Sequence, residues 1–569
     1  MSNPSPTRLT VTQWLIIAIA AIGFLFDTYE LLMTPLVGVP AIAELLKLPP
    51  NHPTVMDWMG RMLWITALCG GTFGLLGGWL IDRFGRKKIL AASIFMYAFS
   101  PFAAAFASSL TAFIFFRCTT FIGVCVEFIA AITWLAELFP DKRRKEIVLG
   151  STQAFASLGG VLVTAVSLWM TTHASSLPLL PISEAFNQHA PWRYLLITGL
   201  IPAIPIALML PFVPESQVWR ERRAAGTLKR PSFGALFSPE LRRVTLVTAA
   251  LSACAYAAAF GALQITTRSI VPGLPELAQE RKELKPLRAE AAGLNAQVSA
   301  IMPAFEQSLA AVPGLEELAG KRAKTRIAQR AARKADNKEL LGSLGKQFAG
   351  YDAELDKLAT PEAKKVVIDR EKLLKALGDN REKQEPFTDN ISKRGDVVQL
   401  SQETGGLTGR IILAGLLLTA IPRGRMLRLF LLPGVFLFAG TYFQLYHVGG
   451  AAFALGIFFC GLLVVAQFSY FGEYLPKVFP VHLRGTGGSF ATNVGGRMIG
   501  TSAAILSTNI IAPMLNPNPT FDQYAMAAGI TGTVVLAIAF ALSFLLPEPK
   551  DEEIAQSNAS APSTADTTR

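Results

Sequence analysis

The chain has few charged residues for its length. Asp, Glu, Lys and Arg make up 17% of its 569 residues, whereas ordinary globular domains carry about a quarter. There is no CxxC or Cys/His pattern, so we expect neither a disulfide framework nor a zinc site. A phosphate-binding P-loop and a Ser/His/Asp arrangement are also missing. We therefore do not expect an enzyme, an ATP-driven pump or a protein with a bound metal or cofactor.

Long apolar runs recur along the sequence, which is 51% hydrophobic. Several runs reach about 20 residues, the length that crosses a bilayer as a helix. Backbone groups in lipid must be satisfied internally, so these runs are predicted as helices. We expect an all-α membrane protein with twelve transmembrane helices, at about 12–38, 58–80, 89–108, 110–138, 147–170, 192–213, 243–270, 404–421, 427–446, 449–472, 488–512 and 523–546.

These runs divide the chain into two sets of six helices. The first apolar run is too long for a signal peptide and contains Asp27 and Glu30, so we expect it to stay as a membrane anchor. The predicted parts are a first six-helix bundle at 1–213, a cytoplasmic inter-bundle loop at 214–242, a second six-helix bundle at 243–271 and 399–547, an outer-side insertion at 272–398, and a disordered cytoplasmic tail at 548–569.

Positive charge is concentrated in alternate connections. The net charge is +12, and Lys and Arg cluster after the second, fourth, sixth, eighth and tenth predicted helices, whereas 171–190 and 513–522 contain neither. This asymmetry is what the positive-inside rule describes, so the charge does not call for nucleic acid. We expect a multi-pass protein of the cell (inner) membrane with both termini cytoplasmic and the insertion on the outer, periplasmic side.

The insertion has two coiled-coil-like rows of apolar residues. Pro286 suits a helix first turn, and Pro303 and Pro313 are expected to kink or end the helix. The two rows predict an antiparallel helical hairpin, which is either purely structural or a site for partner binding or gating. The rows are Leu287, Ala291, Leu294, Val298, Ile301 and Phe305, and then Leu344, Phe348, Tyr351, Leu355 and Leu358.

The connection after the second predicted helix reads Gly77-Gly78-Trp79-Leu80-Ile81-Asp82-Arg83-Phe84-Gly85-Arg86-Lys87-Lys88. It resembles the signature loop of the major facilitator superfamily, G-x-x-x-D-R-x-G-R-[RK]. The resemblance implies two parallel six-helix halves and an ion-pair latch between them. The alternative is a basic loop that only sets topology. The predicted gating residues are Gly78, Asp82, Arg83, Gly85, Arg86, Glu137, Arg144, Glu473 and Arg484.

Other stretches extend this resemblance over both halves. The segment from Arg117 to Arg144 is similar to the fourth helix of sugar porters and proton-coupled organic-acid symporters. Pro214-Glu215-Ser216 resembles their PES element, and Pro547-Glu548-Pro549 is a weaker copy. In the second half, Ile421 is placed where Asp82 would repeat, so an acidic latch there is in doubt.

Four charged residues are predicted inside the bilayer, where ions usually face a cavity or a partner. Asp27 and Glu30 lie three residues apart in the first helix, and Arg117 and Glu127 lie in the fourth. The pattern resembles aromatic-acid and metabolite proton symporters, and sugar porters also place an acid and an arginine in these helices. We expect proton coupling, in which protonation of Asp27 or Glu127 frees Arg117. The alternative is a static ion pair.

Further polar residues are predicted near the middle of the membrane and are candidates for substrate binding. Each of the amides could equally bridge helices, and Arg410 could instead reach the outer surface. His447 is expected to be solvated. The candidates are Gln153, Gln264, Arg410, Gln444, Gln467, Asn493 and Arg497.

Together these features predict a monomeric secondary active transporter that moves a small polar metabolite by alternating access, with protons as the coupling ion. An organic acid is favoured over a sugar because arginines accompany the acids. The alternatives are a uniporter or exporter on the same scaffold, and a membrane sensor whose outer insertion binds a protein partner.

Overall fold

The computed structural model describes residues 10–48, 53–139, 142–182, 186–201, 203–226, 232–334 and 337–549. Every regular element in these ranges is helical. The chain divides into two compact units. Met1–Pro275 and Arg394–Arg569 form one, which we call the membrane unit, and Glu276–Lys393 forms the other, which we call the insertion unit. The tail predicted at 548–569 lies almost wholly outside the described residues.

The N-terminal half of the membrane unit begins at a capping box, in which Thr10 and Gln13 satisfy each other's backbone N–H groups. The predicted fifth helix is divided at Phe155, and the sixth is made of two short helices. The half consists of α1 (Val11–Leu45), α2 (Pro53–Phe84), α3 (Arg86–Ala105), α4 (Leu110–Leu138), α5 (Lys142–Ala154), α6 (Ala156–His173), η1 (Ala174–Ser176), α7 (Pro191–Thr198), α8 (Ala203–Met209) and η2 (Leu210–Phe212). The connection to the next half contains α9 (Gln217–Ala224) and η3 (Gly234–Phe237).

The C-terminal half contains several π-helical turns, which are frequent at functional sites. Its elements are α10 (Arg242–Ala258), η4 (Ala259–Leu263), η5 (Thr266–Ile270), η6 (Val271–Gly273), the end of α14 (Pro361–Leu417), α15 (Arg423–Gly440), η8 (Thr441–Leu445), α16 (Tyr446–Val448), α17 (Gly450–Val478), η9 (Val481–Leu483), α18 (Arg484–Ser489), η10 (Phe490–Gly500), α19 (Ala503–Ile505), η11 (Leu506–Ile511), α20 (Ala512–Leu515) and α21 (Phe521–Ser543). The two halves meet mainly where α2 packs against α18 and η10.

Eleven helices in the described ranges are long and apolar enough to cross a membrane. The remaining predicted helix, at 404–421, is the apolar end of α14, which continues without a break from the insertion unit. This end packs closely on α17 in the membrane unit: a Cβ atom on Gly405 or Gly409 would lie 2.0 or 2.1 Å from the carbonyl oxygen of Phe458 or Leu462. Glycine at these positions lets two helix backbones touch.

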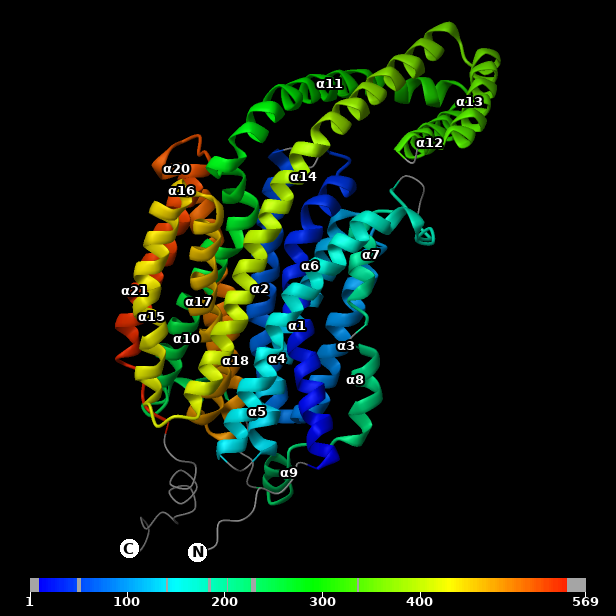
Figure 1. The fold of residues 1–569 in the computed structure, drawn as a ribbon. Helices are drawn as coiled ribbons and strands as arrows, with labels where there is room; N and C mark the ends of the chain where they lie inside the picture. Colours follow the sequence, from blue (N-terminus) through cyan, green and yellow to red (C-terminus); the bar gives the residue numbers. More distant parts are fainter. Residues whose placement is uncertain are drawn as a thin grey trace, which may run out of the picture. The chain divides into compact units, whose positions relative to one another are not determined.

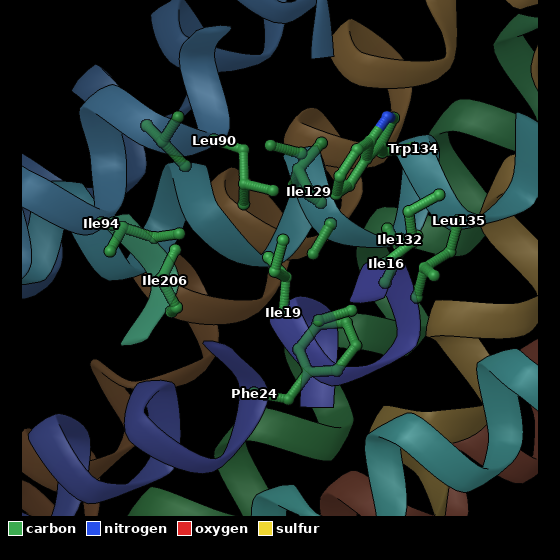
Figure 2. Close-up of a cluster of buried hydrophobic side chains, with 14 of the residues drawn as sticks. Ile16, Ile19, Phe24, Leu90, Ile94, Ile129, Ile132, Trp134, Leu135 and Ile206 are labelled. Carbon is green, nitrogen blue, oxygen red and sulfur yellow. The ribbon is translucent and has the colours of Figure 1, made fainter. Parts of the chain in front are cut away.

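Buried apolar side chains hold the N-terminal half together. Figure 2 shows Ile16, Ile19 and Phe24 of α1 facing Ile129, Trp134 and their neighbours on α4. Leu135 and Val213 belong to the same cluster as Ile16, so α1 begins at the end of the unit where α4 and η2 finish. This end carries the signature loop, whereas Gly273, next to the insertion, contacts Phe521 at the start of α21.

The insertion unit consists of α11 (Ala278–Ala311), α12 (Leu315–Lys334), α13 (Lys338–Leu358) and the first part of α14 (Figure 1). Phe305 and Leu355, from the two predicted apolar rows, share one buried cluster. The pairing differs from a simple hairpin of these rows, because α12 packs on α13 while α14 contacts α11. Pro286 and Pro303 both lie inside α11, so Pro286 does not occupy a first turn and Pro303 does not end the helix.

Candidate functional site

A cavity lies between the two halves of the membrane unit. Side chains of α1, α4 and α6 line one wall, and those of α10, η4, α14, α17 and η10 line the other. Four phenylalanines contribute apolar surface, and the charged lining residues are two acids and two arginines. These eight side chains are Phe24, Phe128, Phe260, Phe468, Asp27, Glu403, Arg410 and Arg497.

Asp27 forms an ion pair with Arg497 inside this cavity, with 3.3 Å between the carboxylate and the guanidinium. The two residues come from opposite halves, on α1 and η10. Arg497 also donates hydrogen bonds to the carbonyl of Val124 and to the side chain of Asn493. The guanidinium lies 5.6 Å from the centre of the Phe128 ring. Arg497 is therefore held against α4 while it contacts α1.

Glu127 lies close to this ion pair. It is fully buried, and neither carboxylate oxygen has a hydrogen-bond partner among the described residues. It follows Val124, which accepts from Arg497, by about one helical turn. Gly23 lies one turn before Asp27 on α1. A Cβ atom on Gly23 would lie 2.4 Å from the Oε1 atom of Glu127. Asp27, Glu127 and Arg497 thus form one buried charged cluster.

Arg117 belongs to a different cluster, and this corrects the expected pairing. Its NH1 atom lies 3.7 Å from Oε2 of Glu30, and its NH2 atom donates to the Glu30 carbonyl and the Thr34 hydroxyl. Asp27 and Glu30 point to different partners because three residues in an α-helix turn the side-chain direction by about 60°. Protonation of Asp27 would therefore release Arg497, whereas Arg117 has Glu30 as its partner in the same half.

The structure separates the predicted substrate residues into groups. Gln264, Arg410 and Arg497 line the cavity, and Arg410 is buried, so it does not extend to the surface. Asn493 and Gln467 are buried but bond to helix atoms: Asn493 donates to Cys125 and Ser489, and Gln467 to the Leu463 carbonyl. Gln444 is exposed, as is His447, and the Gln153 side chain lies outside what the structure describes.

Glu403 is a cavity residue that the sequence did not reveal. It is buried on α14, where Gln399 and Gln402 donate to its Oε1 atom at 3.0 and 3.2 Å. Its Oε2 atom faces α6, because a Cβ atom on Gly160 would lie 2.8 Å from it. The apolar run was predicted to begin at residue 404, so Glu403 fell just outside the predicted eighth helix and was not considered as a cavity residue. The series Gln399, Gln402, Glu403, which keeps one helix face, was the available signal.

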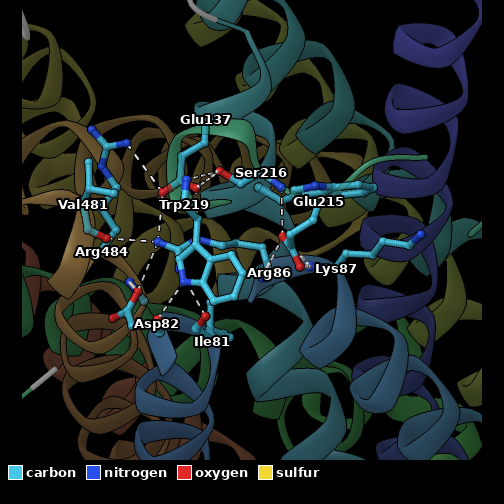
Figure 3. Close-up of polar contacts among 12 residues, drawn as sticks. Ile81, Asp82, Arg86, Lys87, Glu137, Glu215, Ser216, Trp219, Val481 and Arg484 are labelled. Atoms are coloured by element: carbon cyan, nitrogen blue, oxygen red, sulfur yellow. Dashed lines mark hydrogen bonds and ion pairs between the residues drawn. The ribbon is translucent and has the colours of Figure 1, made fainter. Parts of the chain in front are cut away.

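Four of the predicted gating residues, Asp82, Arg86, Glu137 and Arg484, meet at the end of the membrane unit that carries the signature loop (Figure 3). Asp82 accepts hydrogen bonds from the Gly485 and Thr486 amides, at 3.1 and 2.8 Å, and so binds the start of α18. Gly78 allows this approach, since a Cβ atom there would lie 2.5 Å from the Gly485 carbonyl oxygen. These contacts join the two halves directly.

Arg86 lies at the centre of the same network. Its guanidinium donates twice to Glu137, at 2.9 Å each, and once to the Val481 carbonyl of the other half, at 3.0 Å. It also lies 3.4 Å from Asp82. Glu137 lies 3.7 Å from Arg484 across the interface. Asp82, Glu137 and Arg484, which surround the Arg86 guanidinium, are all buried, so the network closes this end of the unit.

Arg83 lies outside this network, and Gly85 has a local role. Arg83 is exposed and stacks over the Trp79 ring at 4.8 Å. Arg144 is partly buried on α5. Gly85 has a φ of +108°, and a side chain there would collide with Glu215, whose carboxylate accepts from the Arg86 and Lys87 amides at the start of α3. This conformation favours glycine.

The C-terminal half repeats part of this arrangement. Glu548 accepts from the Arg423 and Gly424 amides at the start of α15, and Arg423 lies 3.3 Å from Glu473. Arg423 therefore corresponds to Arg86, and the position of Asp82, four residues earlier, is taken by Thr419. The expected correspondence between Ile421 and Asp82 was two residues out of register, although neither assignment places an acid there.

Comparison with known proteins agrees with this architecture. The model of the Major Facilitator Superfamily matches residues 15–312. A cis,cis-muconate transport protein of Acinetobacter baylyi is 31% identical over 259 residues, which cover 44% of this chain and 57% of that protein. A niacin transporter of the same organism is 26% identical over 35% of this chain and 40% of its own length. The match thus spans only about half of these relatives.

Solved structures show the same fold over nearly the whole chain. A proton:xylose symporter with a bound bromo-deoxyglucose superimposes with a TM-score of 0.52, at 16% identity, and covers 94% of this chain and 96% of its own. The Escherichia coli fucose:proton symporter gives a TM-score of 0.52 at 12% identity, with 94% and 98% covered. The family match, the two helical halves and the signature loop at their interface establish that the chain belongs to the major facilitator superfamily.

Proposed function

We propose that this protein is a proton-coupled symporter that moves a small organic anion across the cell membrane by alternating access. The observation that carries the proposal is the Asp27–Arg497 ion pair, which lies in the cavity and joins the two halves. Because the pair lies in the cavity and its members come from opposite halves, a change in the protonation of the cavity also changes the contact between the halves. A single chain supplies both halves, so a monomer is sufficient.

The coupling follows from the electrostatics of this cluster. Protonation of Asp27 removes the charge that holds Arg497, so the guanidinium becomes available to a substrate carboxylate and the halves lose one contact. No described residue donates a hydrogen bond to the Glu127 carboxylate, an arrangement that a protonated carboxyl group tolerates much better than an ionised one. We assign the coupling proton to Asp27 and Glu127. We assign to Arg117 and Glu30 a structural role, in which their ion pair stabilises the packing of α1 on α4 within the N-terminal half.

The cavity lining favours an organic anion with an apolar, unsaturated body. Arg410 and Arg497 supply two cationic groups, and Phe24, Phe128 and Phe260 supply apolar faces for a planar molecule. The relatives named for cis,cis-muconate and niacin support this class, because both compounds are unsaturated carboxylic acids. A sugar is the second candidate, since Gln264 and Gln402 also line the cavity and could bind hydroxyl groups.

The gating network indicates the direction of opening. The positive-inside pattern assigns the signature-loop end, with both termini, to the cytoplasm and the attachment of the insertion to the outer side. On this assignment the Asp82 and Arg86 contacts close the cytoplasmic end. Opening to the cytoplasm then requires these contacts to break, which is how an interface latch selects between two states.

Uptake into proteoliposomes tests this function. We expect labelled cis,cis-muconate, nicotinate or benzoate to accumulate when the outside is acidic, and D-xylose to stay at background. With Asp27→Asn we expect accumulation to be lost, while Asp27→Glu, which can still titrate, keeps part of it. Transport of D-xylose alone would overturn the substrate class. Uptake that is independent of the pH gradient in the unmodified protein would overturn proton coupling.

A further inference from the structure

The insertion unit contains a cavity of its own, distinct from the one between the halves. All four of its helices contribute lining residues, including Phe305 of α11, Arg326 of α12, Phe348 of α13 and Arg370 of α14. Apolar side chains such as Val367 and Leu374 form part of the wall. The charged lining residues are four cations and three acids, namely Arg326, Arg333, Arg370, Lys375, Glu371, Asp379 and Glu382. The lining therefore combines aromatic rings with an excess of cationic groups, and nothing in the proposed transport cycle uses it.

One side of this cavity is fixed by a buried salt bridge. The Arg322 guanidinium is nearly inaccessible and donates to both oxygens of Glu371, at 2.8 Å each, and to Asp352 at 2.6 Å. Arg326 donates to the same carboxylate at 2.8 Å. Both arginines stack on the Phe348 ring, at 4.5 and 5.2 Å from its centre. The charges of Arg322, Arg326, Glu371 and Asp352 are paired with one another. We therefore regard these residues as structural: they hold α12, α13 and α14 together around the cavity.

Arg370 is in a different position. Its guanidinium stacks on the Phe305 ring at 4.2 Å, and its Nε atom donates to the Met302 sulfur. Among the described residues, no oxygen accepts a hydrogen bond from its terminal nitrogens, and the nearby carboxylate of Glu371 is hydrogen-bonded to Arg322 and Arg326 instead. Stacking on a ring fixes the plane of a guanidinium and leaves its edge available for a carboxylate, which binds in a bidentate manner. Lys375, five residues further along α14, also lines the cavity and adds another cation.

We propose that this cavity binds a small organic carboxylate, with its carboxylate on Arg370 and Lys375 and its apolar body between Phe305, Val367 and Leu374. A preformed concave site with apolar walls and a few convergent polar groups is the usual form of a small-molecule site. The position of Arg370 gives the ligand class: a stacked guanidinium beside apolar surface suits an anion that carries a hydrophobic part. The proposal does not depend on the transport function.

Binding of 4-fluorobenzoate to the purified full-length protein tests the site. Its affinity is measured by ¹⁹F NMR, and its place by hydrogen–deuterium exchange. We expect protection of the α12 and α14 peptides around Arg326 and Arg370, and no protection by the neutral 4-fluorobenzamide. Arg370→Gln is expected to weaken the binding that gives this protection by about tenfold, and Lys375→Gln to weaken it less. Lys365→Gln, an exposed cation on another face of α14, serves as the matched control and should leave it unchanged.

Each outcome bears on the proposal. Protection in the insertion unit that is lost in Arg370→Gln and kept in Lys365→Gln supports it. Equal protection by inorganic phosphate would overturn the organic class, and protection confined to peptides of the cavity between the halves would overturn the site while leaving the transport function intact. If Arg370→Gln proves unfolded by its exchange pattern, Lys375→Gln decides, because the Lys375 side chain is exposed and its replacement leaves the buried core unchanged.

Discussion

The carboxylate of Asp27 and the guanidinium of Arg497 lie 3.3 Å apart, although 470 residues separate them in the sequence. They lie in the cavity between the two halves and join α1 to η10. In the proposed mechanism, a change in the charge of either residue therefore acts on substrate binding and on the contact between the halves at the same time.

Glu127→Gln tests whether the second acid of this cluster carries a proton. We expect the variant to exchange labelled substrate across the membrane but to lose at least tenfold of the accumulation driven by a pH gradient, because a neutral amide resembles the permanently protonated acid. Counterflow and gradient-driven uptake in the same proteoliposomes separate the two effects. Glu240→Gln, in the exposed connection between the halves, is the control. Gradient-driven accumulation at the normal level would remove Glu127 from the mechanism.

Arg86 is predicted to be the most important residue for stability in the gating network. Arg86→Met leaves Asp82 and Glu137 buried without their main counter-ion, so we expect a loss of about 3 kcal/mol. Arg83→Met removes only an exposed stacking contact, worth about 0.5–1 kcal/mol. Thermal unfolding of the two purified variants provides the comparison. Equal unfolding temperatures would show that the buried network contributes little.

Glu137 and Glu473 occupy related positions but should differ in their effect on gating. Glu137 contacts Arg484 of the other half, whereas Glu473 contacts Arg423 and Lys477 of its own half. We expect Glu137→Gln to increase hydrogen exchange in η9 and α18, where the halves meet, and Glu473→Gln to leave that exchange near its normal level. The same increase in both variants would contradict this assignment.

The pH dependence of the insertion unit is predicted to follow Glu371. Burial alone raises the pKa of this carboxyl, but hydrogen bonds from Arg322 and the charges of Arg326 and Arg322 outweigh burial and hold the pKa below its usual 4.5. The stabilisation is therefore complete above pH 4.5 and is lost as the pH falls through the lowered pKa. Pepsin cleavage of 276–393 at decreasing pH measures this loss. In Glu371→Gln the unit should be less stable at neutral pH and should lack this component of the pH dependence.

Close packing of α14 on α17 gives a further test. A side chain on Gly409 would overlap the Leu462 carbonyl, so Gly409→Ala should force the helices apart and cost about 1–3 kcal/mol. Gly415 lies on the same helix with nothing within 4 Å of an added Cβ atom. Gly415→Ala should therefore be neutral or stabilise by up to about 1 kcal/mol through helix propensity. Thermal unfolding distinguishes the two, and the reverse order would contradict the packing.

The sequence predicted the helical halves and the signature loop because hydrophobic periodicity and local motifs encode them. The helix break at Phe155 was not predicted, because a one-residue interruption of the helix leaves the hydropathy of an apolar run unchanged. Hydropathy also placed the start of the eighth helix at residue 404, so the buried Glu403, one residue earlier, was not considered as a cavity residue. A polar residue on a cavity wall lowers the local hydropathy, so a hydropathy profile ends the membrane helix there although the helix continues.

The pairing of the buried charges could not be predicted in the same way. Depth along two antiparallel helices suggested that Arg117 faces Asp27, but rotation about the α1 axis directs Asp27 to the other half and Glu30 to Arg117. Such a choice depends on how the halves pack, which no local pattern in one helix contains. The roles of these residues in proton coupling and substrate binding stay predictions that the variants above test.

The unbroken course of α14 determines how the insertion could be removed by protein engineering. Excision of 276–393 would turn Arg394 into the first residue of a shortened helix, whose initial amide groups would have no acceptors. Gly395 lies beside Thr267, with 3.3 Å between an added Cβ atom and the Thr267 methyl carbon, so the segments before and after the insertion lie side by side and can be joined by a linker from Pro275 to Arg394. A Ser or Asp placed before Arg394 would restore a cap, and a minimal transporter could be built from this splice.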